Sequence, residues 1–572
     1  MLWVPAFDPA VPPPAELSLW ARRLEISPVL ASLLWRRGLR DLADMDFFLN
    51  PVLRRLSPLE QWPGVREAAA LLARGLLSGG RLCVWGDYDV DGISATALVK
   101  DFLRLHGFAC VHYIPARLAE GYGLNSQGLD RLAGEGVDLL LTVDVGISDV
   151  RAVAHAKELG MTVIVSDHHL PGVELPPADA IVNPRLADCP CPALAGVGVA
   201  FFLMGALNAA LEQAGRKRAD LRPLLDLVAL GSLADVVDVN GQNRILIKNG
   251  LLKIAQGERV GIAALKAACG FAPGAALGAG QVVFGLAPRL NAAGRMGSAE
   301  TALELLLTGD RDKAALLAEE LSRLNDQRRR EEEDILEEAR LLARQEVEHG
   351  RMGLVLYSPS WHLGIIGIVA SRLAESLRRP TVILADAGDR LKGSGRSVPG
   401  VDMNGLFGSC APLLLGFGGH SMAAGLSLSP AALELFRLRF DDLVRGILGA
   451  SPGEGQCRID GELAFAQADF TFLKELEMLQ PFGMGNREPV FVSPPVRVRA
   501  MRSRPGFLRL DLEDEDSGLR LRATAWREQA AMPASLKGRR IRIAYTPRID
   551  RYNGAASVEL RLKDWKEEED GQ

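Results

Sequence analysis

The feature that most constrains the fold is an alternation of short apolar runs and helical segments between residues 61 and 182. The apolar runs, rich in β-branched residues, are 82–85, 137–143, 161–165 and 178–182. The segments with helical character are 63–77, 94–105 and 149–159. Strands that alternate with helices are typical of βαβ units, so the pattern predicts a parallel sheet covered by helices.

Acidic residues and histidines follow three of these predicted strands. Asp87, Asp89 and Asp91 come after the run 82–85. Asp144 comes after the second run, and His168 and His169 come after the third. Because ligands of an open parallel sheet bind beyond the carboxyl ends of its strands, we expect these side chains to meet at one edge.

The residue types at this edge favour a divalent metal site. Asp89 and Asp91 are two positions apart and would point the same way in an extended stretch. Clustered carboxylates repel one another unless cations neutralise them, and oxygen ligands with imidazole suit Mn²⁺ or Mg²⁺. Two such ions could activate water against a phosphodiester. A lone Asp-x-Asp is usually a turn and a lone His-His a surface or capping pair, but the coincidence of three clusters argues for metal.

The rest of the chain predicts a connector and two further domains. Residues 298–350 are helical and highly charged, and an unbroken helix over 312–348 would be roughly 55 Å long. Its charge run, 328–334, is typical of a solvated face. A second α/β segment follows, with strands at 353–357 and 381–384 and a helix between them. After residue 451, short alternating strands predict a small β-barrel or sandwich.

The C-terminal segment is locally basic, although the 572-residue chain has a net charge of −5. Its arginines are Arg497, Arg499, Arg502, Arg504, Arg509, Arg520, Arg522, Arg527, Arg539, Arg540, Arg542, Arg548, Arg551 and Arg561. Their acidic neighbours lie mostly within 511–516. Nucleic-acid binding depends on where basic residues cluster, so this segment is a candidate surface for a single strand.

Composition and the N-terminal sequence favour a cytoplasmic protein without a membrane span. The seven cysteines have no regular spacing, so we expect no disulfide framework. We expect no signal peptide, because no basic leader precedes an apolar run. The longest apolar run, 195–207, is shorter than a bilayer requires and is interpreted as a buried helix.

The three clusters resemble motifs of the DHH phosphoesterases. The matching segments are 87–92, 142–146 and 167–169, and a fourth match is 231–237. The resemblance implies that the metal ligands are Asp89, Asp91, Asp144, His168 and Asp235, with Asp144 bridging two ions. It also implies that His169 is a ligand or acts on the scissile phosphate. Asp87 is a candidate for the site or for its outer support, and Asp226 is interpreted as structural.

Within that superfamily, most of the chain is similar to the RecJ exonucleases. The segments that carry this resemblance are 287–297, 361–372, 393–397, 416–425 and 480–486. It implies a parallel-sheet DHH domain, a DHH-associated α/β domain joined to it by a long helix, and a C-terminal β-barrel of the oligonucleotide-binding (OB) type. The expected boundaries are an N-terminal extension 1–60 packed on the next segment, a catalytic domain 61–300, a connector 301–350, a substrate-binding domain 351–450 and an OB-like domain 451–572.

The resemblance also implies a set of substrate-binding residues. Arg117, Ser394 and Arg396 match positions that bind a 5′-phosphate, and glycine-rich loops around the last two would let the backbone approach it. Gly418, Gly419 and His420 are expected at a phosphate, and Arg295 at the DNA backbone. The predicted catalytic residues are Asp87, His169 and His420. Phe507, Tyr545 and Tyr552 are candidates either for base stacking or for the core.

The expected function is a 5′→3′ exonuclease specific for single-stranded DNA that releases 5′-mononucleotides with two Mn²⁺ or Mg²⁺ ions, in recombination and repair. Single-strand-binding protein and a helicase are candidate partners, and a monomer is expected. One alternative is a nanoRNase or cyclic-dinucleotide phosphodiesterase, although a dinucleotide needs no extended track. The other is a scaffold without catalysis, which should have lost acids at these strand ends.

Overall fold

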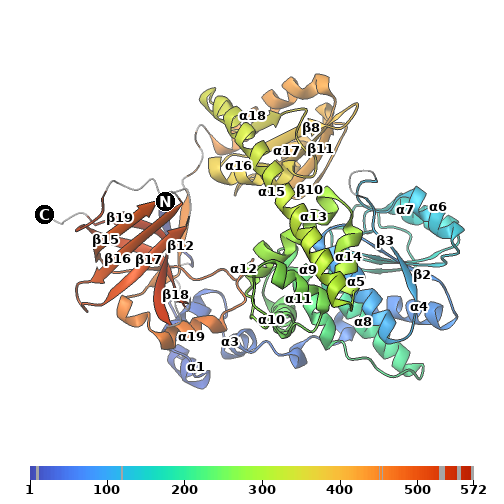
Figure 1. Ribbon diagram of the computed structural model, residues 1–572, viewed down its shortest axis with the longest axis horizontal. Helices are drawn as coiled ribbons and strands as arrows, with labels where there is room; N and C mark the ends of the chain where they lie inside the picture. The colour runs from blue at the N-terminus through green and yellow to red at the C-terminus, as the bar shows by residue number, and fades with distance from the viewer. Residues whose placement is uncertain are drawn as a thin grey trace.

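A computed structural model describes residues 1–7, 12–116, 120–449, 451, 453, 455–504, 506–526, 535–550 and 556–568. It has two α/β domains joined by a long helix, together with a C-terminal β-barrel, as predicted (Figure 1). The first α/β domain lies at the right of Figure 1, the second at the top and the barrel at the left.

The first domain is built on a five-stranded, wholly parallel sheet. Its strands, in spatial order, are β3 (Cys110–Tyr113), β2 (Leu82–Gly86), β4 (Leu139–Val143), β5 (Thr162–Ser166) and β6 (Ala180–Val182). The edge strand β3 was not predicted, and its residues are only partly buried. The strand order reverses between β2 and β4, and ligands of an open parallel sheet bind beyond the carboxyl ends of the strands at such a point.

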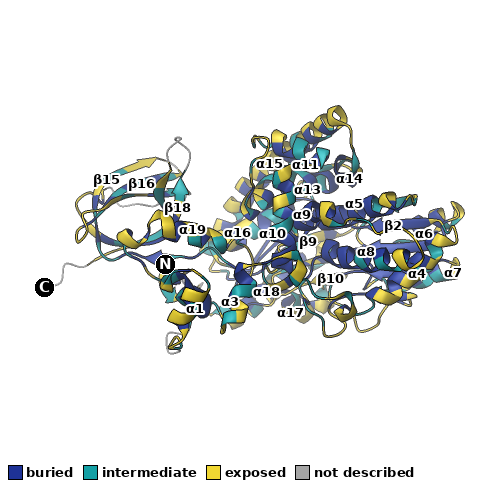
Figure 2. Ribbon diagram, turned by 90° about the horizontal axis from the view of Figure 1, so that it is seen from below, coloured by how far each residue is buried: buried dark blue, intermediate teal, exposed yellow. Residues whose placement is uncertain are grey.

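Helices cover both faces of this sheet. One face is covered by α4 (Val65–Leu77), α5 (Val90–Leu105) and α8 (Gly196–Gln213), and the other by α6 (Ser126–Gly134) and α7 (Val150–Glu158). The later helices pack mainly on α5, on α8 or on one another; they are α9 (Leu225–Ala234), α10 (Gly241–Gln256), α11 (Val260–Ala268), α12 (Ala279–Gln281), α13 (Ala287–Met296) and α14 (Ala299–Leu307). Alternate strand residues enter different cores: Val84 packs with α4, α5 and α8, whereas Trp85 packs with α6 and α7. In Figure 2 the sheet and the helix sides turned toward it are buried, and exposed residues lie on the outer sides of the helices.

Helix α8 corresponds to the predicted buried helix. Within the described chain it is the one helix with the length and composition of a membrane span, and 72% of that window is buried inside the protein. It therefore has the surroundings of a core helix.

The connector is a single helix, α15 (Arg311–Glu348), close to the predicted bounds. Its first half contributes Ala318 and Leu321 to the core of the first domain. Its second half contributes Leu336 and Ala339 to the core of the next domain. A continuous helix that is packed at both ends holds the two domains in a defined relation.

The second α/β domain has a mixed five-stranded sheet. In spatial order its strands are β10 (Gly416–Gly419), β11 (Ala423–Leu428), β9 (Leu391–Arg396), β8 (Thr381–Asp386) and β7 (Leu354–Tyr357). Its helices are α16 (Ile366–Leu377), α17 (Met403–Ser409) and α18 (Leu433–Leu448). Only β7 and β8 are parallel, and the β9–β11 part is antiparallel.

The C-terminal domain closes into a five-stranded barrel. Its strands are β15 (Val496–Arg504), β16 (Phe507–Asp514), β17 (Arg520–Trp526), β18 (Arg540–Asp550) and β19 (Ser557–Glu567). β18 pairs with both β15 and β19, and β19 pairs with β17, so the order 15-16-17-19-18 returns to β15. Short strands β13 (Gly461–Glu462) and β14 (Phe491–Val492) and helix α19 (Phe470–Met478) flank the barrel.

The N-terminal segment packs differently from the prediction. Strand β1 (Leu2–Pro5) pairs in parallel with β12 (Gln456–Ile459). Helices α1 (Leu17–Arg23), α2 (Pro28–Arg36) and α3 (Leu42–Leu49) share the core of the barrel, and the N-terminus lies beside it in Figure 1. The partly buried Leu53, Leu56 and Leu59 pack on the adjoining catalytic domain, which also donates hydrogen bonds to the carbonyls of Phe48 and Pro51. The extension therefore packs mainly on the C-terminal barrel, and only its last part contacts the next segment as expected.

Candidate metal centre

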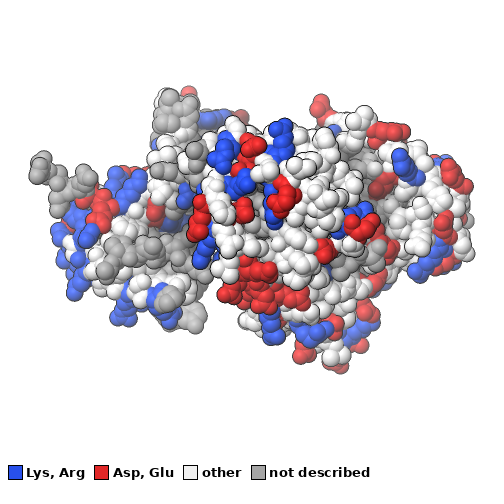
Figure 3. Space-filling model, turned by 90° about the horizontal axis from the view of Figure 1, so that it is seen from above, with Lys and Arg blue, Asp and Glu red and all other residues white. Residues whose placement is uncertain are grey.

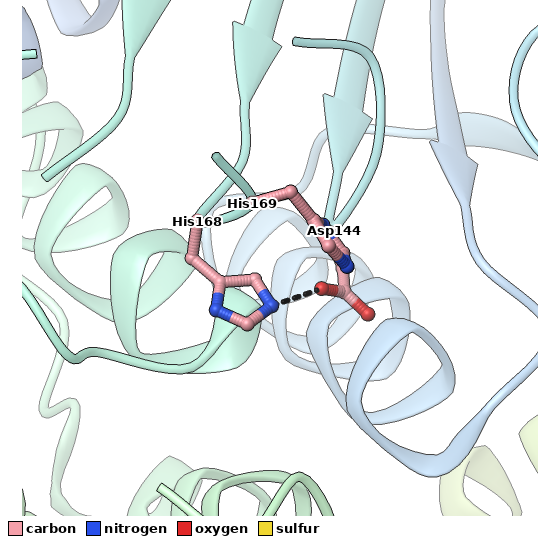
Figure 4. A group of neighbouring side chains, drawn as sticks. All are labelled: Asp144, His168 and His169. Atoms are coloured by element: carbon pink, nitrogen blue, oxygen red, sulfur yellow. Dashed lines mark ion pairs between the residues drawn. The ribbon is translucent and has the colours of Figure 1, made fainter. Parts of the chain in front are cut away.

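The residues predicted after the strands converge at one edge of the parallel sheet. Asp144 and His168 face one another there (Figure 4), and Nε2 of His168 is 3.1 Å from Oδ1 of Asp144. The same nitrogen lies 3.8 Å from Oδ2 of Asp235 and 4.0 Å from Oδ2 of Asp91. Asp235, from a helix end far along the chain, thus completes the cluster.

Three overlapping groups of side chains at this edge have ligand atoms within 4.8 Å of one another. They are Asp144 with His168 and His169, Asp91 with His168 and Asp235, and Asp87 with Asp89 and Asp144. Asp144 and His168 each belong to two groups. This overlap is what two neighbouring ions with a shared carboxylate would require.

Two aspartates are held by helix N-termini. Asp89 caps α5 and accepts hydrogen bonds from the backbone N–H groups of Asp91 and Gly92. Asp91 accepts from the N–H groups of Gly196 at 2.6 Å and Val197 at 3.0 Å, at the start of α8. The positive end of each helix dipole stabilises a carboxylate there.

Two residues of the site have left-handed backbone conformations that non-glycine residues rarely adopt. Asp144 has φ of +64°, and Val236, directly after Asp235, has φ of +58°. Such conformations cost of order 1–3 kcal/mol and persist only where the surroundings impose them. A Cβ on Gly196 would lie 2.5 Å from Oδ1 of Asp144, so only glycine leaves room for that carboxylate.

The electrostatics show why the cluster needs cations. Burial, with repulsion from neighbouring carboxylates, raises the pKa of Asp91 and of Asp235 to about 7. The same causes raise the pKa of Asp144 well above its ordinary value. Among the described residues, the ion pairs of these three aspartates run to His168 alone. The donors are oxygen and imidazole without thiolate, so the site fits Mn²⁺ or Mg²⁺.

His169 is oriented by Asp167. Oδ1 of Asp167 accepts from Nδ1 of His169 at 2.8 Å, which leaves Nε2 for an ion or a phosphate. Burial opposes the charged imidazole, but the bond to Asp167 and nearby carboxylates outweigh it and raise the pKa of His169 to about 9. Oδ2 of Asp167 accepts from the N–H of Ile147, which fixes the carboxylate.

Sequence reasoning missed two residues beside the cluster. The guanidinium of Arg185 donates to the carbonyl of His168 at 2.8 Å, and its charge acts on Asp235. The ring of Tyr122 lies edge-on to His169 with centroids 6.0 Å apart. Arg185 comes soon after β6, so its place after the fourth strand could have indicated it. Tyr122 had no comparable signal.

The predicted phosphate-binding residues lie on the second α/β domain. Ser394 and Arg396 are on strand β9, so the prediction that they sit in a loop was wrong. The one residue between them, Gly395, is a glycine for a packing reason, because a Cβ there would lie 2.7 Å from the ring of Phe407. Arg396 donates to Oγ of Ser394 at 2.8 Å, and both approach Gly367 at the start of α16. A hydroxyl, a guanidinium and a helix N-terminus are thus combined.

The remaining predicted residues have separate positions. Gly418 and Gly419 are in strand β10, and His420 follows them. Burial is the main cause that lowers the pKa of His420, and the positive charges of His169 and Arg185 act in the same direction. Arg295 donates to the carbonyl of Gly364 at 3.0 Å, where the two α/β domains meet. Arg117 lies outside the described residues.

Other candidates are structural. Asp226, which is buried, pairs with the largely buried Arg259 at 2.8 Å. The ring of Tyr545 is completely buried and its hydroxyl donates to the carbonyl of Leu463, so it belongs to the core. Tyr552 lies outside the described residues. Phe507 packs against Trp526, which is 60% exposed, with ring centroids 4.6 Å apart.

Comparison with known proteins gives consistent results. Three family models match: the N-terminal domain of the DHH family over residues 81–232, the DHHA1 domain over 351–446 and the RecJ OB domain over 459–564. The single-stranded-DNA-specific exonuclease RecJ of Dickeya dadantii is 39% identical over 94% of this chain and 95% of its own length. The crystal structure of Thermus thermophilus RecJ with Mn²⁺ covers 98% of this chain and 79% of that one, with 33% identity and a TM-score of 0.84. The Mg²⁺ complex of the same protein covers 98% and 78%, with 31% identity and a TM-score of 0.77.

Proposed function

The chain belongs to the RecJ family of single-stranded-DNA-specific exonucleases, and from that premise we propose that it degrades single strands from the 5′ end with two divalent ions. The proposal rests mainly on one observation: Asp144 and His168 each belong to two of the three groups of ligand side chains. The enzyme is a metal-dependent hydrolase that uses Mn²⁺ or Mg²⁺ and acts on single-stranded DNA.

The proposed ligand set is divided between two ions. Asp91, His168 and Asp235 would hold one ion, Asp87 and Asp89 the other, and Asp144 would bridge them. When bound, two such ions supply an activated water and stabilise the leaving oxygen of a phosphodiester. The residues contribute fixed geometry, because Asp89 and Asp91 are held by backbone N–H groups before any ion arrives.

His169 and His420 are proposed to act on the scissile phosphate. Asp167 holds Nδ1 of His169, so Nε2 is free either to bind an ion or to donate to a phosphate oxygen. His420 lies on the facing domain, and its lowered pKa keeps the imidazole neutral near pH 7. A strand between the domains would therefore meet one imidazole from each side.

Ser394 and Arg396 are proposed to bind the 5′-phosphate and so to give the enzyme its 5′→3′ direction. The N-terminus of α16 adds backbone N–H groups and a favourable dipole to the hydroxyl and guanidinium, which together suit a terminal phosphate. Arg117 is proposed for the same phosphate, Gly418 and Gly419 for close backbone approach, and Arg295 for the DNA backbone. Hydrolysis at the metal cluster would then release 5′-mononucleotides one after another.

The biological setting is inferred from this activity. Recombination and repair of DNA in the cytoplasm are proposed, with single-strand-binding protein and a helicase as candidate partners and a monomer as the working state. A dinucleotide phosphodiesterase would have no use for the closed C-terminal barrel. A scaffold without catalysis would have no need for the seven ligand candidates at one edge.

The experiment is digestion of 3′-labelled single strands carrying either a 5′-phosphate or a 5′-hydroxyl. Products would be resolved with Mn²⁺, with Mg²⁺ and with chelator. We expect stepwise loss from the 5′ end, abolished by chelator, and a preference for the 5′-phosphate that Arg396→Gln removes. Lys392→Gln, an exposed cation on the same strand, should keep the preference. Loss from the 3′ end, or cleavage of dinucleotides alone, would refute the proposal.

A further inference from the structure

The segment 480–486, part of the RecJ resemblance but without a role so far, lies against the loop after Asp235. It leaves α19 of the C-terminal domain and turns at Gly483 and Asn486, whose backbone groups bond to each other. The carbonyl of Met484 accepts a hydrogen bond from the N–H of Val239 at 2.9 Å. A segment of the barrel domain is thus bonded to the loop of the first domain that begins at a candidate metal ligand.

The two segments also fit closely. A Cβ on Gly485 would lie 2.6 Å from Nδ2 of Asn240 and 2.9 Å from Oδ1 of Asp238. Gly485 has φ of +70°, which disfavours any side chain there. A Cβ on Gly483 would lie 2.6 Å from Cγ2 of Val239. Loop 236–240 can therefore occupy its position only because both glycines lack side chains.

Arg244, just after this loop in α10, anchors the same contact. It is 1% exposed, and its guanidinium donates to the carbonyls of Met478, Leu479 and Gln480 at 3.0 Å each. It also donates to the carbonyl of Phe48 at 2.7 Å. These carbonyls lie at the ends of α19 and α3, where helix dipoles favour a cation. Burial lowers the pKa of Arg244 to about 10, so it stays charged at neutral pH.

Asn486 holds the other side of the segment. Its side-chain amide, 2% exposed, donates to the carbonyls of Leu479 and Pro481 at 2.8 Å each. Its Oδ1 accepts from Arg37 of the N-terminal helices at 3.0 Å. These hydrogen bonds hold segment 480–486 within the C-terminal domain, separately from its contact with loop 236–240.

This arrangement restrains the loop that follows Val236, at Asp238, Val239 and Asn240. A non-glycine residue at φ of +58° needs its surroundings to over-determine it, and Val236 itself is exposed. The contacts that restrain loop 236–240 come from segment 480–486 on one side and from the end of α9 on the other. We propose that segment 480–486 is a positioning element for Asp235, so that the attached C-terminal domain sets the affinity for the ion held by Asp91, His168 and Asp235.

The inference rests on the proposed function, since it takes Asp235 as a metal ligand. Partners that orient a metal ligand typically change affinity by about 10–100-fold when they are lost. Gly485→Ala should therefore weaken one of two Mn²⁺ binding events by about tenfold and leave the other unchanged. Gly518→Ala is the matched control, because Gly518 has φ of +68° in the same domain with nothing within 4 Å of a Cβ.

A second pair of variants tests the contact by rescue. Gly483→Ala creates a clash with Val239, and Val239→Ala removes the atom that it meets, since Cβ of Val239 is 3.8 Å away. The single Gly483→Ala variant should lose Mn²⁺ affinity, and the double variant should recover it. If segment 480–486 did not position loop 236–240, all of these variants would bind Mn²⁺ with the same affinity.

The measurement is titration of the full-length metal-free protein with Mn²⁺, followed by electron paramagnetic resonance of free Mn²⁺ and by calorimetry. Asp235→Asn is measured alongside. Unchanged Mn²⁺ binding in Asp235→Asn would overturn the proposed metal site itself. Weakened binding in Asp235→Asn with unchanged binding in Gly485→Ala and Gly483→Ala would overturn only the role of segment 480–486.

Discussion

The edge of the parallel sheet and the surface of the C-terminal barrel both concentrate charge, but they balance it in different ways. At the sheet edge, Asp91 and Asp144 are buried and their only described ion-pair partner is His168. On the barrel, nine of the described arginines have a carboxylate partner; they are Arg497, Arg499, Arg509, Arg520, Arg539, Arg540, Arg542, Arg548 and Arg561. Figure 3 shows basic side chains at the barrel end with acidic ones among them.

This difference shows which charged side chains are available to bind a ligand. Buried carboxylates that the protein leaves unbalanced indicate a cation, because burying a charge without compensation is costly. Exposed arginines that are already paired contribute less to a nucleic-acid track than their number suggests. Arg502, Arg504 and Arg522 are the described barrel arginines for which no carboxylate partner is found. The candidate nucleic-acid surface of the barrel is therefore limited to these three arginines.

The largest effect is expected at the bridging carboxylate. Asp144→Ala should lower the rate of single-strand hydrolysis by roughly 10³-fold or more, since it removes a ligand from both ion positions. The free energy of unfolding without metal should not fall, because one source of repulsion is gone. Rates from single-turnover digestion and thermal melts in chelator would measure both.

The matched control is a buried aspartate that the protein does balance. Asp226→Ala leaves the largely buried Arg259 with Asp101 as its remaining carboxylate and should lower stability by about 3 kcal/mol. Its effect on hydrolysis should be small at a temperature where the variant is folded. If Asp144→Ala destabilised the metal-free protein as much as Asp226→Ala does, the sheet edge would not be an unbalanced cluster.

The sequence indicated the sheet edge better than it indicated the barrel, and the reason is physical. Asp87, Asp89 and His168 follow their strands within a few residues, so their common edge is fixed by local order along a parallel sheet. The barrel arginines are paired across strands, as Arg539 is with Glu567, and no local pattern shows such partners. The N-terminal helices share the barrel core through contacts that span most of the chain, which periodicity cannot reveal.

Glycine-rich segments were the other source of error. The segment 393–396 resembled a loop, yet it is a strand whose glycines face Leu384 and Phe407 at distances that exclude a side chain. Glycine at close packing contacts and glycine at a phosphate look the same in a sequence. The pairing of β9 with β8 and β11 distinguishes them.

A smaller effect concerns stability and pH. In the unfolded chain an aspartate titrates near pH 4, whereas burial raises the pKa of Asp91 and Asp235 to about 7 in the folded protein. Unfolding therefore releases protons in this range, and the metal-free protein should lose stability as pH rises from about 4 to about 7. The pKa of His169 is raised to about 9, so the metal-free protein loses further stability as pH rises from the ordinary histidine pKa to about 9.

Divalent ions replace those protons, so the gain in melting temperature on adding Mn²⁺ should be larger at pH 7.5 than at pH 5.5, by several degrees. Each pKa unit corresponds to about 1.4 kcal/mol, which makes the difference measurable. Scanning calorimetry with Mn²⁺ and with chelator at both pH values checks this, with Asp144→Asn as a control that should reduce the gain. An equal gain at both pH values would contradict an unbalanced acidic cluster.

The smallest effect separates the unpaired arginines from the paired ones. Arg502→Gln with Arg504→Gln should weaken single-strand binding by about tenfold and reduce the salt dependence by about 1.4, since each lost phosphate contact changes the slope by about 0.7. Arg539→Gln with Glu567→Gln removes a paired arginine and its partner together, so the local charge is conserved and binding should be unchanged. Fluorescence anisotropy of labelled strands in chelator, at several salt concentrations, compares the two double variants. If both double variants weakened binding equally, DNA would compete with the glutamates for the paired arginines. Paired arginines on the barrel would then be as available to DNA as unpaired ones, which would contradict the comparison with the sheet edge.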